Sequence, residues 1–197
     1  MTGSTESLGG RLPLADPETL TGARRDLYES LKTTWIAYAE ELGVQATTED
    51  GRLIGPFNAM LLHPEVAVKL NEFQAAEAKN TTLPPRVREL VIIAVGAVWL
   101  AEYELYAQVN VARKTGLSDD AVATLASGGV PEDLSDEEKI AARLAFELMS
   151  RHRVDDELYR EAEQAFGRTG LFDILTVMGE YQTVCSMMAL FEVPVPD

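Results

Sequence analysis

Four polar residues, Glu89, Glu102, Glu104 and Gln108, interrupt an otherwise apolar stretch near the middle of the chain, and helical spacing turns Glu102 away from the other two on its segment. Glu89 lies at the start of this stretch, and Glu104 and Gln108 lie in its second half. A carboxyl group among apolar side chains is destabilising unless it is paired or hydrogen-bonded, and burial raises its pKa. Two such carboxyls close together give one acid and one base near neutral pH. The stretch therefore predicts a catalytic set of Glu89, Glu104 and Gln108.

The spacing of these residues decides whether they can meet. In a continuous helix, positions 101, 104 and 108 share a face, because three and four residues each make about one turn. Glu104 and Gln108 then point into the same space, with Ala101 one turn before them. Glu89 reaches that space only if the chain bends near Gly96 or folds back.

Glu89 also has a purely structural interpretation. Arg86 and Arg88 lie close to it in the sequence, and either guanidinium group could neutralise a buried carboxylate. The catalytic and structural interpretations differ in whether the carboxyl group is already paired within the protein.

The elements that must position these residues are helices. Apolar residues recur at helical spacing, Gly and Pro residues separate the segments, and strand patterns are nearly absent. The sequence predicts an all-α bundle of about seven to nine helices, with a flexible tail over residues 1–16 and a single domain over residues 17–197. The predicted helical segments are 27–42, 64–80, 86–114, 118–125, 135–153, 155–167 and 171–191.

Composition excludes several classes of function. The formal charge of −15 argues against nucleic acid and an anionic membrane surface as partners, because both require a basic face. The single cysteine, Cys185, cannot form an intramolecular disulfide, which suits the reducing cytoplasm. We expect no metal site, because no His, Cys and carboxylate residues show a ligand spacing. We also expect no cofactor, because no phosphate-binding loop is present.

Two segments are apolar on nearly every side, namely the first half of 86–114 and the helix at 171–191. A chain of 197 residues has little core in which to bury two such helices. We therefore expect part of this apolar surface to be buried in a homo-oligomer, as a dimer, trimer or hexamer.

Several segments together resemble the carboxymuconolactone decarboxylase and alkylhydroperoxidase (AhpD)-like family. The resemblance spans roughly residues 20 to 195, and it rests on the order and spacing of the motifs rather than on any single one. It implies an AhpD-like helical bundle with a buried core helix pair. The matching segments are residues 83–92, 101–108 and 112–118, with 55–57 and 61–65 upstream and 179–181 and 191–194 downstream.

The resemblance also implies what this chain has lost. In the alkylhydroperoxidase branch, a Glu is followed by a CxxC pair and then a His. Glu89 matches the Glu, whereas Ala101, Glu104 and Gln108 stand where the two cysteines and the histidine would be. A thiol peroxidase needs a reactive thiolate and a resolving thiol. Cys185 is in the wrong segment, so we expect no thiol peroxidase activity.

The resemblance therefore implies a cofactor-independent lyase or isomerase that acts on a small carboxylated or lactone-type substrate. Gln108 cannot shuttle protons at pH 7, so Glu89 and Glu104 would carry the acid–base chemistry. We expect Tyr103, Tyr106 and His63 to bind the substrate. The alternative is a non-catalytic member of the family that binds a small molecule or serves as a scaffold.

Overall fold

The computed structural model describes residues 7–196, and these residues form the all-α protein that the sequence predicts. The only β pairing among them is an isolated bridge between Thr47 and Leu53. Two 3₁₀ turns, η1 (Ser7–Gly9) and η2 (Pro17–Thr19), come before the helices. In chain order the helices are α1 (Gly22–Leu31), the π-helical segment η3 (Lys32–Ile36), α2 (Ala37–Glu41), α3 (Pro56–Met60), α4 (Pro64–Asn80), α5 (Pro85–Trp99), α6 (Glu102–Thr115), α7 (Asp119–Ala126), α8 (Asp136–Arg151) and α9 (Asp156–Phe191).

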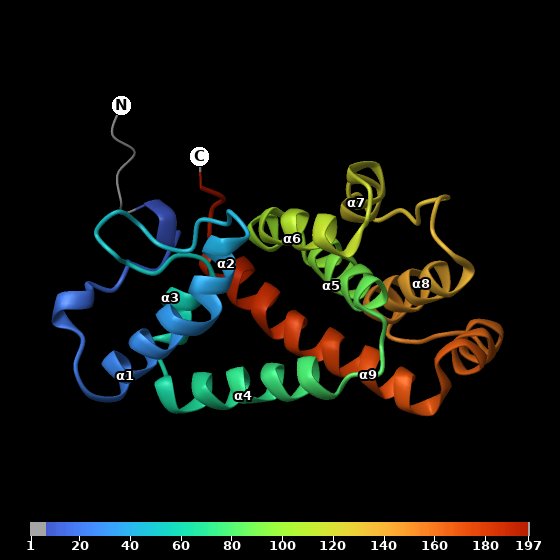
Figure 1. The fold of residues 1–197 in the computed structure, drawn as a ribbon, viewed down its shortest axis with the longest axis horizontal. Helices are drawn as coiled ribbons and strands as arrows, with labels where there is room; N and C mark the ends of the chain where they lie inside the picture. Colours follow the sequence, from blue (N-terminus) through green and yellow to red (C-terminus); the bar gives the residue numbers. More distant parts are fainter. Residues whose placement is uncertain (1–6, 197) are drawn as a thin grey trace.

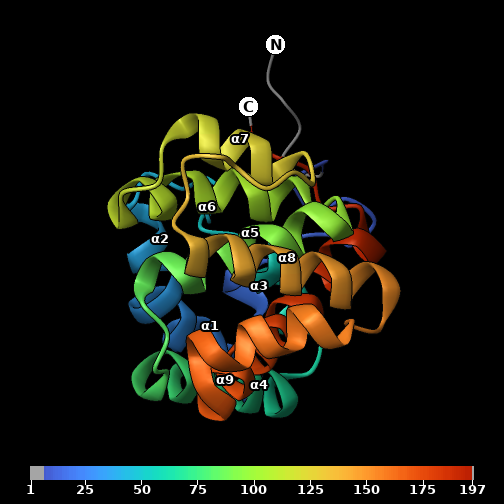
Figure 2. The ribbon, with the colours of Figure 1, turned by 90° about the vertical axis from the view of Figure 1, so that its right-hand side faces the viewer.

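α5 is the central element of the fold. It packs against α6, α7, α8 and α9, and Figure 2 shows α6 and α7 above it and α9 below. The side chains from Leu90 to Val95 are each at most 1% exposed. A helix without a polar face is stable only when neighbours cover it on all sides. The predicted burial of this segment is therefore confirmed.

The core helix pair is a hairpin of α5 and α6. The sequence leaves two ways for Glu89 to reach the residues of α6, a bend near Gly96 or a fold-back of the chain, and the structure shows the fold-back. α5 continues to Trp99, and the chain reverses at Leu100, which has a left-handed backbone (φ 51°). Gly96 is instead a close-packing point: a Cβ atom there would lie 3.1 Å from Cδ2 of Leu105. The missing side chain therefore lets α6 approach α5, which brings the two helices' polar residues together.

Most predicted helix ends are confirmed. Ser135 and Glu138 form a complete capping box at the start of α8, and the Ser118 side chain caps α7. α6 ends at Gly116, which has a left-handed backbone (φ 85°). The predicted break at Gly167 is present as a kink, because this residue leaves the helical conformation while α9 continues on both sides of it.

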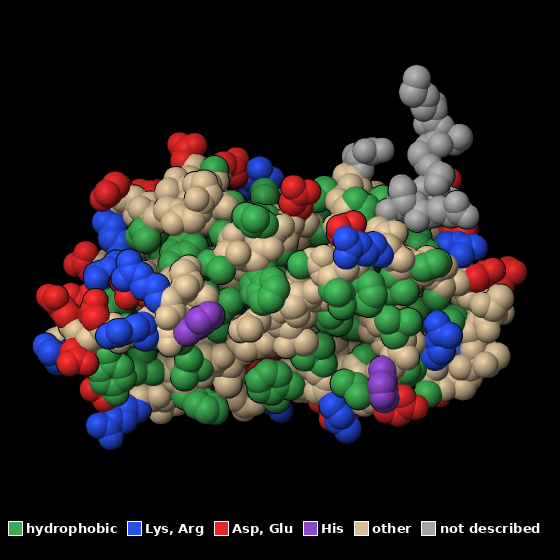
Figure 3. Space-filling view, turned by 180° about the vertical axis from the view of Figure 1, so that it is seen from behind, with side chains coloured by type: hydrophobic (Ala, Val, Ile, Leu, Met, Phe, Trp, Pro, Cys, Tyr) green, Lys and Arg blue, Asp and Glu red, His purple; other side chains and the backbone are tan. Residues whose placement is uncertain are grey.

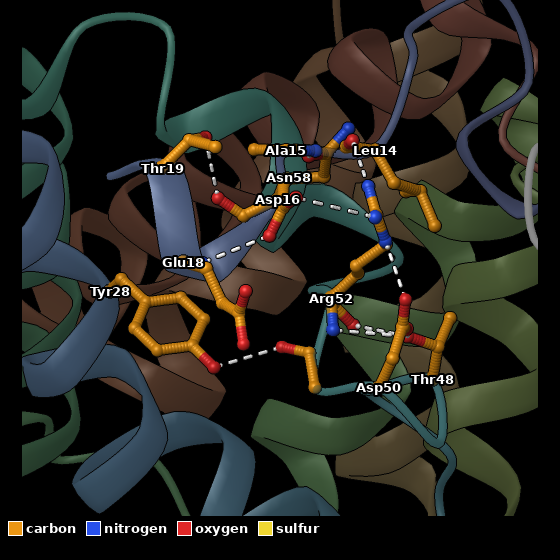
Figure 4. Close-up of polar contacts among 11 residues, drawn as sticks. Leu14, Ala15, Asp16, Glu18, Thr19, Tyr28, Thr48, Asp50, Arg52 and Asn58 are labelled. Atoms are coloured by element: carbon orange, nitrogen blue, oxygen red, sulfur yellow. Dashed lines mark hydrogen bonds and ion pairs between the residues drawn. The ribbon is translucent and has the colours of Figure 1, made fainter.

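The predicted flexible tail is only partly within the described residues, and the described part is packed. Residues 1–6 lie outside the described range. Leu14 is 8% exposed and belongs to the core, and the Arg11 N–H donates to the Phe191 carbonyl. Figure 4 shows Arg52 and Asn58 bonded to the backbone of this segment, at Leu14 and Ala15. The prediction of a tail over 7–16 is wrong, because the polar composition conceals these long-range backbone contacts.

α9 is the one described helix with the length and apolar composition of a possible membrane span. It is kinked at Gly167 and packs against α4, α5 and α8, as a core helix does. Its outer side still exposes Phe172, Leu175 and Leu190, which are 50–65% exposed. Figure 3 shows hydrophobic side chains spread across one face of the molecule, with charged side chains gathered towards its ends.

Candidate active site

A cavity of about 310 Å³ lies between two groups of helices. The α5–α6 hairpin and α9 form one side, and η3, α2, α3 and α4 form the other (Figure 1). Most of its lining is aliphatic or aromatic, including Trp35, Phe57 and Ile92, and Tyr38 at its edge is 48% exposed. An apolar cavity of about 150 Å³ holds benzene, so this cavity has room for a substituted ring.

The hairpin brings all three predicted catalytic residues to this cavity. Glu89 on α5 and Glu104 and Gln108 on α6 all line it, and their exposed fractions are 2%, 4% and 8%. The Gln108 Nε2 group donates to Oε1 of Glu104 over 2.5 Å. Oε1 of Glu89 is buried and has no hydrogen-bond partner among the described residues. The structure thus juxtaposes the two carboxyl groups and leaves one of them free to meet a ligand.

Burial perturbs both carboxyl groups, and their surroundings differ. Desolvation, reinforced by the nearby charge of Glu104, raises the pKa of Glu89 to about 8. Desolvation also raises the pKa of Glu104 to about 7, and the hydrogen bond from Gln108 opposes this rise. At neutral pH, Glu89 therefore retains its proton more readily than Glu104. The arrangement provides an acid and a base, which is what proton transfer between two positions of a substrate requires.

The contacts of Arg86 and Arg88 do not support the structural interpretation of Glu89, in which one of these arginines neutralises its carboxylate. Arg86 pairs with Glu138 on α8 over 2.6 Å. Arg88 pairs with Glu77 on α4 over 2.7 Å and, more weakly, with Glu180 on α9 over 3.4 Å. Neither guanidinium group is bonded to Glu89, so this carboxyl group lacks the partner that a purely structural role would need.

Tyr103 lines the cavity, but its hydroxyl group is already engaged. That group donates to the Gln45 carbonyl over 2.8 Å, so the ring rather than the hydroxyl faces a ligand. The ring also lies against Gly55, where an added Cβ atom would come within 2.5 Å of it. Gly55 has a positive φ of 66°, which favours glycine. The loop before α3 therefore fixes Tyr103 as a rigid part of the cavity wall.

The other two predicted substrate-binding residues lie away from this cavity. Tyr106 comes two residues after Glu104, so helical geometry turns it to a different side of α6. Its hydroxyl group accepts a hydrogen bond from the Gln45 N–H over 3.0 Å, and it lines a separate pocket with Ile93. The His63 side chain is 70% exposed at the start of α4, beside Glu65. The structure gives neither residue a place at the carboxyl pair.

Sequence reasoning missed a second polar cluster beside the cavity. Arg88 and Tyr181 line the cavity, and the Arg88 guanidinium carbon lies 5.8 Å from the centroid of the Tyr181 ring. Glu77 and Glu180 hold the guanidinium group from behind. The one available signal was the similarity of the sequence at 180–181 to that at 102–104, which placed a Glu–Tyr pair on each of two apolar helices.

The described part of the chain contains neither a reactive thiolate nor a cluster of side chains that could hold a metal ion. Cys185 is fully buried, and desolvation raises the pKa of its thiol well above the usual range, which disfavours a reactive thiolate. Within residues 7–196, no three His, Cys, Asp or Glu side chains lie close enough together to hold a metal ion.

Comparison with known proteins connects this geometry to a family. Residues 64–147, which contain α5, α6 and the two cavity carboxyls, match the carboxymuconolactone decarboxylase family. No curated protein sequence matches the chain. Two solved structures share its fold. One is the debrominase Bmp8 in complex with 2,3,4-tribromopyrrole, which is 14% identical with a TM-score of 0.71, over 98% of this chain and 94% of that one. The other is an alkylhydroperoxidase AhpD core, an uncharacterized peroxidase-related protein from Ralstonia eutropha JMP134, which is 14% identical with a TM-score of 0.71, over 95% and 92%.

Proposed function

Because residues 64–147 match the carboxymuconolactone decarboxylase family and the chain has an AhpD-like fold, we propose that this protein is a cofactor-independent acid–base enzyme. It acts as an isomerase or lyase on a small carboxylated or lactone-type compound. The observation that carries the proposal is the pair of buried carboxyls, Glu89 and Glu104, in one ring-sized cavity. The ligand of the debrominase with the same fold is also a single small ring.

Each carboxyl has one part in the proposed reaction. Glu104, the more readily ionised group, takes a proton from the carbon next to a carbonyl group. The electron pair of the broken C–H bond forms a C=C bond, and the carbonyl π electrons move onto oxygen to give an enolate. In a β,γ-unsaturated substrate the enolate extends over the second C=C bond. Glu89 then delivers its proton to the far (γ) carbon while the electron pair on oxygen re-forms the C=O bond, which shifts the C=C bond to the α,β position. In the lyase variant, loss of CO₂ from a carboxyl group β to the carbonyl gives the same enolate, and Glu89 protonates it.

Replacing Glu104 with Gln is expected to reduce turnover by about 10²- to 10⁴-fold, because the amide cannot accept the proton. The assay follows the conversion of a β,γ-unsaturated butenolide to its α,β-unsaturated isomer by NMR in D₂O, where deuterium incorporation also reports proton abstraction. Glu102→Gln is the matched control, because this exposed carboxyl is on the same helix and does not line the cavity.

The same assay distinguishes the alternative function. Full activity in Glu104→Gln would refute the assignment of the base. If the unmodified protein binds the butenolide, as detected by the fluorescence of Trp35 in the cavity wall, without turning it over, the non-catalytic binder or scaffold becomes the better explanation.

We further infer that the exposed apolar side of α9 is buried between copies of the chain, and that the protein is cytoplasmic, where its one cysteine stays reduced. Sedimentation velocity is expected to show a species larger than the 21.6 kDa monomer. Phe172→Glu should shift it towards the monomer, because a charge would enter the apolar contact. Tyr159→Glu, at an exposed position before the Gly167 kink, is the control. A single 21.6 kDa species in the unmodified protein would contradict the inference.

A further inference from the structure

Two hydrogen-bond donors at the cavity wall have no hydrogen-bond partner in the part of the chain that the structure describes. The guanidinium group of Arg88 bonds to Glu77 through Nε (2.8 Å) and Nη2 (2.7 Å) and approaches Glu180 through Nη2 (3.4 Å). Within residues 7–196, its Nη1 group and the hydroxyl group of Tyr181 have no hydrogen-bond partner. Both residues line the cavity. The cavity therefore holds two open donors as well as its two carboxyls.

Two glutamates contact Arg88, but only one of them, Glu77, neutralises its positive charge at pH 7. Glu77 on α4 forms the close pair with it. Desolvation, reinforced by Glu77, raises the pKa of Glu180 well above its usual range, so Glu180 is largely neutral at pH 7. The other groups that face this region are Glu89 on α5, Glu104 on α6 and Tyr181 on α9, and burial raises the pKa of each. Tyr181 therefore remains a hydroxyl donor.

The proposed reaction requires such donors. When Glu104 removes a proton from carbon, a full negative charge develops on the carbonyl oxygen inside an apolar cavity that already contains an ionisable pair. Positioned donors at that oxygen are usually among the largest contributions to catalysis. Among the described residues, Arg88 is the only cationic side chain that lines the cavity.

We propose that Arg88 and Tyr181 form an oxyanion-binding site in the cavity, which holds the oxygen of an enolisable carbonyl compound while Glu104 and Glu89 move the proton. This inference rests on the proposed function, and it narrows the substrate to molecules whose reacting carbon lies next to a carbonyl. The atoms and electrons balance: the proton passes from carbon to Glu104 and the electron pair onto oxygen, and the pair returns from oxygen when Glu89 protonates carbon. Proton exchange with water then restores the two carboxyl groups. No oxidant or reductant takes part.

Binding of 4-nitrophenol tests the site without turnover, because its anion resembles an enolate and absorbs differently from the neutral phenol. With the unmodified protein at pH 7, the bound ligand is expected to be more ionised than the free one. Tyr181→Phe removes only the hydroxyl group and should weaken binding of the anion by about tenfold or more. Tyr103→Phe is the matched control, because this tyrosine lines the same cavity with its hydroxyl group already bonded to Gln45.

Three results would overturn the proposal. They are a bound ligand that is less ionised than the free one, an equal effect of Tyr181→Phe and Tyr103→Phe, and no binding to the folded protein. Each is separable from a failure of the proposed function. An oxyanion preference with no conversion of the butenolide supports the site without the reaction, whereas conversion with no such preference supports the carboxyl pair without this site.

Discussion

Replacement of Arg88 with Leu is expected to lower the free energy of unfolding by about 3–5 kcal/mol at neutral pH. Arg88 lies between Glu77 and Glu180, whose side chains are 2% and 0% exposed. Without the guanidinium group, a buried carboxylate remains with no counter-charge, and one oxygen of each carboxyl already lacks a hydrogen-bond partner. Urea denaturation at pH 7, followed by circular dichroism, measures the loss.

Two variants test the cause of this loss. Adding Glu77→Gln to Arg88→Leu should restore part of the stability, because the stranded charge is removed. Arg86→Leu is the matched control from the same helix, since its pair with Glu138 is 35% exposed on the arginine side and should matter less. Equal losses for the two arginines, or no restoration by Glu77→Gln, would show that the buried charge is not what Arg88 balances.

The stability of the protein is expected to fall as the pH rises from 5 to 9. Glu89 has an ordinary pKa of 4.5 in the unfolded chain and a pKa of about 8 in the folded protein. Between these values the folded state binds more protons than the unfolded state. The contribution of Glu89 is therefore fully present below 4.5, and it falls by up to about 1.4 kcal/mol per pH unit until the pH passes 8. Glu104 adds a loss of the same sign up to about pH 7.

Glu89→Gln isolates this contribution, because the amide does not ionise. At pH 5 the variant should differ little from the unmodified protein, and at pH 9 it should be more stable by at least about 1 kcal/mol. Glu102→Gln, which changes an exposed carboxyl, should leave the pH profile unaltered. Parallel profiles for the unmodified protein and Glu89→Gln would mean that Glu89 is not buried as a neutral acid.

The helices were predictable from the sequence because their ends are set by residues that lie close together in the chain. Pro64, the capping box at Ser135 and the glycine at position 116 define helix ends through contacts within a few residues, which a sequence displays directly. The reversal at Leu100 was not predictable in this way, because a leucine with a left-handed backbone carries no turn signal. A bend near Gly96 was one of two alternatives that the sequence left open, and in the structure the absence of a side chain at Gly96 allows close packing against Leu105.

The contacts within the site also divide into those that local sequence spacing predicts and those that depend on tertiary packing. Glu104 and Gln108 meet because they lie one helical turn apart, so the sequence predicts their contact. Arg88 meets Glu77 and Glu180 across three helices, and no local spacing encodes that encounter. For the same reason Arg88 was wrongly considered as a partner of Glu89, its neighbour in sequence. Neighbours on a helix point in different directions, and tertiary packing decides which of them share a space.

α4 forms one wall of the cavity, and we expect its local stability to control how fast a ligand enters and leaves. Only four of its residues are buried, and two of these, Gln74 and Glu77, are polar, so little apolar area holds it in place. Elements of this kind open by local unfolding at a free energy well below that of the whole protein. The ionic contacts of Arg88 with Glu77 on α4 and with Glu180 on α9 then help to hold α4 in the closed position. Desolvation and the charge of Glu77 raise the pKa of Glu180 to about 8 in the folded protein, so the closed form loses stability when Glu180 ionises despite the attraction of Arg88. We therefore expect the residence time of a ligand in the cavity to shorten in alkaline solution.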